Sequence, residues 1–152
     1  MRTLLALPAL ALLGAAAPSG DAAKPDAEAL ERGKAVYMKT CVACHQANGQ
    51  GLAPVFPPLD GSEWLEKDPA LLARIVLRGL QGPIKVKGLD FNMVMAPLGE
   101  QLKDAEIADV LNYVRATYGK GGSLADEALV KSAREATKDQ KQPFTAAELG
   151  IK

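Results

Sequence analysis

The sequence is poor in several residue types that often build cores and metal sites. Aromatic residues make up 5% of its 152 residues, and it has two cysteines and a single histidine. A domain with so few aromatic rings must fill its core with something else, and a bound group would supply that bulk. A site that needs two histidine ligands is excluded.

The chain also lacks an excess of charge of either sign. Eighteen basic residues balance 18 acidic ones, and no cluster of like charge stands out. Binding to nucleic acid or to an anionic membrane surface through a basic patch is therefore disfavoured. Hydrophobic residues at 48% and charged residues at 24% are ordinary for a soluble globular protein.

A long hydrophobic run is missing as well. The apolar stretch Leu4–Leu13 follows one early positive charge and leads into small residues, which is the layout of a secretory signal peptide. It is shorter than the roughly 20 residues that a membrane helix needs, and no cysteine follows it for a lipid anchor. We predict a signal peptide over residues 1–19 and an exported, soluble, periplasmic protein with no membrane span after cleavage.

No strand pattern of any length is present, and the fold is predicted to be all-α. Helical periodicity or capping signals mark three segments, Asp26–Thr40, Asp68–Leu80 and Leu102–Gly119. The connections between them are long and rich in glycine and proline. These segments place one domain at residues 26–119.

Residues 120–152 are predicted to form a helical C-terminal extension. Ser123 with Asp126, and Thr145 with Glu148, resemble capping boxes that would begin two short helices. Because their apolar faces are thin, we expect these helices to dock on the domain and not to form a core of their own.

Both cysteines and the histidine lie within five consecutive positions, Cys41-Val42-Ala43-Cys44-His45. This C-x-x-C-H pattern is the attachment motif for c-type haem, in which two thiols bond the porphyrin edge and the histidine binds the iron. A disulfide between Cys41 and Cys44 would close so short a loop that it gains little entropy, and it would leave His45 unexplained. A thioredoxin-like redox pair needs a βαβ setting, which this chain lacks. A zinc site needs four ligands, and only three are present here. We favour one covalently bound haem c, with His45 as an iron ligand.

The second axial ligand, if the iron has one, must be sought among the methionines. Met95 precedes Pro97 in an irregular segment before the last predicted helix, which could present its sulfur to the iron. Met93 lies two residues away and is the competing candidate, whereas Met38 is expected to belong to the core. Methionine ligation would raise the reduction potential and close the iron to substrates.

The chain resembles a bacterial class I monohaem cytochrome c over roughly residues 30–119. The resemblance rests on the C-x-x-C-H motif and on the segments "FPPLDG", "NMVMAPLG" and "DAEIADVLNYVRATYG", in this order. The likeness is greatest to cytochrome c domains that accompany periplasmic nitrite reductases and quinoprotein dehydrogenases. It implies the class I fold, with three main helices around one haem and the short C-terminal helices appended.

The resemblance also implies roles for single residues. Cys41 and Cys44 would hold the haem, His45 and Met95 would ligate the iron, and the Pro57 carbonyl would bind the free ring nitrogen of His45. Trp64 and the arginines Arg74 and Arg78 could meet the haem propionates. Gly33 and Tyr37 are expected to cross Leu111 and Tyr113.

The function expected from these features is electron transfer, with no catalytic residues. Exported redox proteins would be the electron donor and acceptor. The alternative is a haem-containing subunit of an oxidoreductase, of nitrite reductase, dehydrogenase or peroxidase type, whose sixth iron position is open or exchangeable. No second histidine and no acid–base pair near the methionines supports that alternative.

Overall fold

A computed structural model describes residues 24–151, so the predicted signal peptide lies outside the described residues. The helices of this part are α1 (Ala27–Thr40), α2 (Val42–His45), the 3-10 helix η1 (Glu63–Glu66), α3 (Pro69–Arg78), α4 (Asp104–Thr117) and α5 (Glu127–Ala136). The strands are β1 (Leu80–Gln81), β2 (Ile84–Val86), β3 (Leu89–Phe91) and β4 (Phe144–Thr145). None of the helices between residues 24 and 151 has the length and apolar character needed to cross a membrane.

The three predicted main helices are confirmed, and their ends follow the capping signals in the sequence. Asp26 accepts a hydrogen bond from the Ala29 backbone at 2.7 Å, and Asp68 accepts one from the Ala70 backbone at 2.7 Å. At the start of α4 the Glu106 carboxylate reaches back to the Lys103 N–H at 2.8 Å. This bond supports a helix start that has lysine at the capping position.

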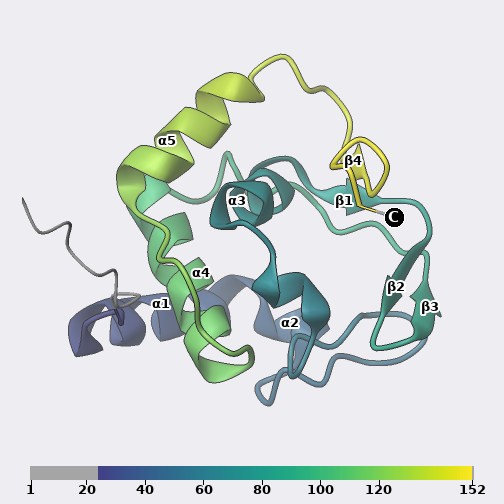
Figure 1. The fold of residues 1–152 in the computed structure, drawn as a ribbon, viewed down its shortest axis with the longest axis horizontal. Coiled ribbons are helices and arrows are strands. Elements are labelled where there is room, and N and C mark those ends of the chain that lie inside the picture. The colour runs from purple at the N-terminus through teal and green to yellow at the C-terminus, as the bar shows by residue number, and fades with distance from the viewer. Residues whose placement is uncertain (1–23, 152) are drawn as a thin grey trace, which may run out of the picture.

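Helices α1 and α4 cross in direct contact, as Figure 1 shows. The crossing depends on Gly33, where an added Cβ would lie 2.2 Å from the Asp109 carbonyl oxygen. Arg32 and Asp109 form an ion pair of 2.7 Å beside it. The expected meeting of the first and last main helices is confirmed.

The predicted all-α class is confirmed, since helices dominate the described residues and each strand among them has only two or three residues. These short strands were not predicted. β2 and β3 pair antiparallel around Lys87 and Gly88, which both have positive φ, 51° and 78°. This is the backbone of a two-residue hairpin turn, usually marked by Asn-Gly or Asp-Gly. The Lys-Gly sequence carries only half of that signal.

The C-terminal extension packs against α3 and α4, and Val130 of α5 is fully buried in the main core. Asp126, and not Ser123, caps α5 by accepting from the Leu129 N–H at 2.7 Å. Asn112 of α4 exchanges two hydrogen bonds of 2.8 Å with the Ala125 backbone just before it.

The second predicted C-terminal helix does not form. Thr145 and Glu148 do exchange hydrogen bonds, at 2.7 and 3.3 Å, but a turn follows that ends at Gly150 with φ 71°. The segment is too short to repay the cost of starting a helix.

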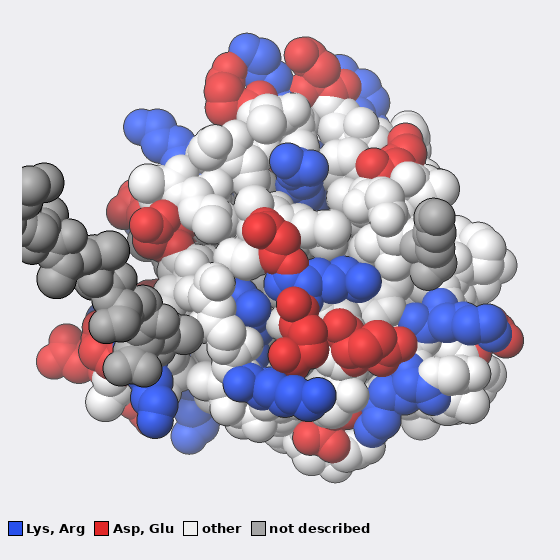
Figure 2. All heavy atoms as spheres, in the orientation of Figure 1, with Lys and Arg blue, Asp and Glu red and all other residues white. Residues whose placement is uncertain are grey.

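On the face drawn in Figure 2, acidic and basic side chains are interspersed, with uncharged surface between them. This face offers no large region of one sign, in line with the balanced composition.

Candidate functional site

The end of α1 and the single turn of α2 place the thiols and the imidazole together. The Cys41 N–H donates to the Tyr37 carbonyl at 2.9 Å, and the His45 N–H donates to the Cys41 carbonyl at 3.0 Å. Residues three and four apart share one face of a helical turn, so Cys41, Cys44 and His45 lie on the same side. Both thiols are free, Cys41 half-buried and Cys44 exposed.

The His45 ring is held by the following loop. Its Nδ1 lies 3.0 Å from the Pro57 carbonyl oxygen. Because a carbonyl can only accept, Nδ1 carries the hydrogen and Nε2 keeps its lone pair. Burial lowers the pKa of His45, and the Pro57 bond opposes that shift. The imidazole is thus favoured in the neutral form that ligates a metal.

Gly51 lets this loop close on the histidine. Its N–H donates to the His45 carbonyl at 3.0 Å, and its φ is 60°. An added Cβ would lie 2.4 Å from the Phe56 carbonyl oxygen. A side chain at this position would therefore push the segment that carries Pro57 away from His45.

An open pocket with almost wholly apolar walls begins at Cys41 and His45. Concave sites with mostly apolar walls are where proteins usually bind cofactors. Its walls come from η1, α3, α4 and residues 92–99, which we call the methionine segment. They include Trp64, Leu72, Ile75, Met95, Leu111 and Val114. Two thiols, a neutral imidazole and an apolar enclosure are the chemistry that a covalently held haem requires.

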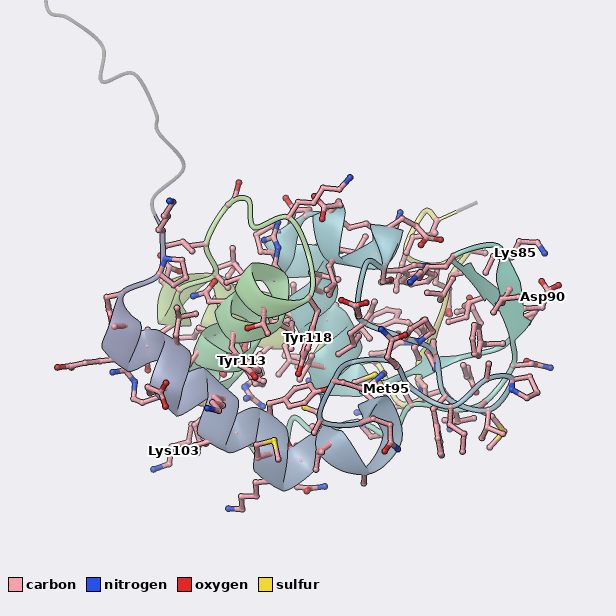
Figure 3. The ribbon with its side chains drawn as sticks, turned by 90° about the horizontal axis from the view of Figure 1, so that it is seen from below. Lys85, Asp90, Met95, Lys103, Tyr113 and Tyr118 are labelled. Atoms are coloured by element: carbon pink, nitrogen blue, oxygen red, sulfur yellow. The ribbon has the colours of Figure 1, made fainter. Side chains whose placement is uncertain are left out.

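Met95 reaches this cavity because its backbone is paired with β1. The Met95 N–H donates to the Leu80 carbonyl at 2.8 Å, and the Leu80 N–H donates back at 3.1 Å. Gly79 permits the close approach, since a Cβ there would lie 2.4 Å from the Met95 carbonyl oxygen. Figure 3 shows Met95 in the interior, whereas Lys85 and Asp90 lie at the outer edge of the β2–β3 hairpin.

The two other methionines of the described chain are more exposed than Met95. Met93 is 54% exposed and does not line the apolar pocket, but it lines a neighbouring hollow together with Cys41, Cys44, His45 and Met95. Met38 is 47% exposed, so the expectation that it belongs to the core was wrong. Met95 is thus the methionine that lines both hollows.

The structure separates the residues expected to meet the propionates. Trp64 is buried and lines the cavity, but its indole N–H donates to the Lys85 carbonyl at 2.8 Å. Arg74 is exposed and lines a different hollow, beside Thr137 and Phe144 of the extension. Arg78 donates to the Thr137 hydroxyl at 3.2 Å. The extension therefore occupies the arginine face of α3, which the sequence of the helix could not reveal.

Tyr37 meets Tyr113 as expected, and Tyr118, which the sequence analysis did not include, completes a cluster of three tyrosines behind the attachment motif. The rings of Tyr37, Tyr113 and Tyr118 lie 5.5 to 6.0 Å apart, and Figure 3 shows the latter two on α4 and at its end. The Tyr37 hydroxyl donates to the Gln46 carbonyl at 2.6 Å, and that of Tyr118 to the Ala47 carbonyl at 2.8 Å. Both bonds hold the chain directly after His45. Their acceptors are backbone atoms, which leave no pattern in a sequence.

Replacing Tyr118 by phenylalanine is expected to lower the free energy of unfolding by about 1 kcal/mol near neutral pH, because one hydrogen bond is lost. Burial raises the pKa of Tyr118 to about 12. The folded state therefore keeps a proton that the unfolded state loses above its ordinary tyrosine pKa of about 10, and stability falls as the pH rises from about 10 to 12. Denaturant unfolding at several pH values should show that the free energy of unfolding falls less steeply with pH in Tyr118→Phe than in the wild type. Equal slopes in the two proteins would show that Tyr118 does not cause this pH dependence.

The crossing of α1 and α4, the C-x-x-C-H turn and the apolar pocket beside it together define a c-type cytochrome of class I fold. The chain belongs to the cytochrome c family, because the sequence model of the family described as Cytochrome c matches residues 30–117. Members of this family bind covalently attached haem c and transfer electrons.

Similar proteins include a free cytochrome and subunits of larger enzymes. The chain is 40% identical to cytochrome c-552 of Thermus thermophilus, over 97% of this chain and 83% of that protein. It is 35% identical to the gluconate 2-dehydrogenase cytochrome c subunit of Pantoea cypripedii, over 60% of this chain and 21% of the subunit. It is 34% identical to the alcohol dehydrogenase (quinone) cytochrome c subunit of Gluconobacter oxydans, over 57% of this chain and 18% of the subunit. The expected likeness to dehydrogenase cytochrome domains is thus supported, and the likeness to nitrite reductase domains stays a prediction.

Proposed function

We propose that this chain is a periplasmic carrier of single electrons. Cys41 and Cys44 hold one haem c through thioether bonds, His45 is the proximal iron ligand, and Met95 is the distal one. The protein passes an electron between exported redox proteins.

The observation that carries the proposal is the pairing of His45 with Pro57 in a cavity that Met95 also lines. The 3.0 Å contact with the Pro57 carbonyl fixes the ring tautomer and leaves Nε2 free for a metal. Met95 is anchored on β1 by two backbone hydrogen bonds, so its segment is held at the cavity wall. A neutral nitrogen and a thioether sulfur are both suited to haem iron.

The chain's residues would then set the properties of the redox centre. The bound haem supplies iron that alternates between its ferrous and ferric states. Apolar side chains such as Leu72, Ile75 and Leu111 keep water from the centre, which strengthens the influence of nearby charges. The sulfur of Met95 favours the ferrous state and raises the reduction potential.

Contact with redox partners is proposed at the exposed attachment edge. Cys44 is exposed there, and Met93 and Val94, which are 54% and 58% exposed, line the same hollow. A partner that covers these apolar side chains would come close to the porphyrin edge without needing a strong charge on its own surface.

The second candidate function is a cytochrome subunit of an oxidoreductase. It is favoured by the similarity to the cytochrome subunits of gluconate and alcohol dehydrogenases. An open iron site is disfavoured, because His45 is the single histidine of the chain and no second imidazole can assist a substrate at the iron.

The test is the absorption spectrum of the purified protein in both oxidation states, with and without carbon monoxide. We expect a low-spin spectrum that carbon monoxide leaves unchanged over minutes, because both axial positions are taken by protein ligands. Rapid carbon monoxide binding by the resting ferrous protein would refute the closed carrier and favour the enzyme subunit.

A further inference from the structure

The strand β1 lies between the methionine segment and the C-terminal extension. On one side Leu80 exchanges two backbone hydrogen bonds with Met95, at 2.8 and 3.1 Å. On the other side Leu80 pairs with Phe144 of β4, and the Phe144 N–H donates to the Gly79 carbonyl at 3.1 Å. Figure 1 shows β4 beside β1 although they are far apart in the sequence. The extension thus supports the backbone that anchors Met95.

The extension also holds the other end of the methionine segment, through Arg134 of α5. Its guanidinium donates to the Gly99 carbonyl at 2.6 Å, the Leu102 carbonyl at 3.0 Å and the Asp104 carboxylate at 2.7 Å. These acceptors span the connection from the methionine segment to the first residue of α4. The Arg134 side chain is 29% exposed and that of Asp104 is 18% exposed, so solvent screens this ion pair less than a surface pair.

Helix α5 is itself fixed to the domain, which makes Arg134 a firm anchor. Val130, one turn earlier, is fully buried. At the end of α5 the Thr137 hydroxyl accepts from Arg78 of α3 at 3.2 Å. Movement of residues 96–103 away from the cavity would therefore break the two bonds of Arg134 to the Gly99 and Leu102 carbonyls, while its ion pair with Asp104 keeps the guanidinium at the start of α4.

We infer that the C-terminal extension acts as a clamp on the Met95 segment that keeps its sulfur on the iron, with Arg134 as the main positioning residue. The inference rests on the proposed ligation by Met95. Dissociation of the sulfur requires the segment to swing outward, and the clamp holds it at Leu80 and at Gly99–Asp104. Weakening the clamp increases the population of the open state, to which an external ligand can bind.

The test is the rate of cyanide binding to the ferric holoprotein, measured for the wild type, Arg134→Met, Arg134→Lys and Met95→Ala. Lys131→Met is the matched control, because Lys131 is exposed on the same helix. Arg134→Met should bind cyanide about tenfold faster or more than wild type, since charge-assisted hydrogen bonds are lost. Arg134→Lys should be intermediate, because one ammonium cannot reproduce the planar fork, and Lys131→Met should match wild type.

Hydrogen–deuterium exchange of the same holoproteins separates a local clamp from general loss of stability. Arg134→Met should speed exchange at the amides of Met95 and Leu102 and leave those in the middle of α1 unchanged. Equal acceleration in α1, or a cyanide rate equal to that of wild type, would overturn the clamp.

Met95→Ala distinguishes failure of this inference from failure of the ligation. If Met95→Ala binds cyanide quickly while Arg134→Met behaves as wild type, the clamp alone is refuted. If Met95→Ala is as slow as wild type, the proposed ligation fails, and the clamp fails with it.

Discussion

Replacing Met95 by alanine is expected to open the sixth iron position and to lower the reduction potential. The variant should become high-spin in the ferric state and bind carbon monoxide rapidly in the ferrous state. If the open form of the wild type is populated at about 1%, removing the competing sulfur increases apparent carbon monoxide affinity about a hundredfold. Absorption spectra, carbon monoxide titration and a potentiometric titration measure the three changes.

Met93→Ala is the matched control for this experiment. Met93 is the same residue type two positions away, but it is 54% exposed and does not line the apolar cavity. It should keep the low-spin spectrum and the wild-type potential. An open site in Met93→Ala together with a closed site in Met95→Ala would transfer the ligand role to Met93.

Replacing Gly33 by alanine is expected to lower the stability of the fold by forcing α1 and α4 apart. Its Cβ would lie 2.2 Å from the Asp109 carbonyl oxygen and 2.7 Å from the Cβ of Tyr113, and neither is the end of a flexible side chain. Helices α1 and α4 must then move apart, which costs about 2 to 3 kcal/mol. The better helix propensity of alanine, worth about 1 kcal/mol, offsets only part of this.

Denaturant unfolding of the holoprotein measures this loss, with Lys34→Ala as the control. Lys34 is the exposed neighbour of Gly33 on α1, and its replacement should change the free energy of unfolding by less than about 0.5 kcal/mol. A Gly33→Ala protein as stable as wild type would show that the crossing can widen without cost.

The turn that holds Cys41, Cys44 and His45 could be predicted from the local sequence alone. Cys41, Cys44 and His45 lie on one face of a turn because their spacing matches the helical period, and that relation is contained in five residues. The three main helices were predictable for the same reason, since Asp26 and Asp68 signal helix starts through bonds to residues two or three positions away.

Features that depend on distant partners were not predictable in this way. The tyrosine cluster binds the carbonyls of Gln46 and Ala47, and backbone acceptors carry no residue-specific signal. Arg74 has the right charge for a propionate, and the structure places it, exposed, in a hollow beside Thr137 and Phe144 of the extension. The Lys87–Gly88 hairpin and the turn after Thr145 were missed because short elements depend more on tertiary contacts than on propensity.

The sequence by itself therefore determined the chemistry of this protein: a thiol pair with one histidine, a short supply of possible distal ligands, and helices whose capping residues lie beside them. The tertiary structure decided which methionine lines the cavity, which arginines are used by the extension, and how the extension anchors the Met95 segment. The physical reason is the separation along the sequence over which each interaction acts. Capping and helical periodicity act over three or four residues, whereas the contacts of Leu80 with Met95 and Phe144, and of Arg134 with Gly99, exist only after distant segments have packed.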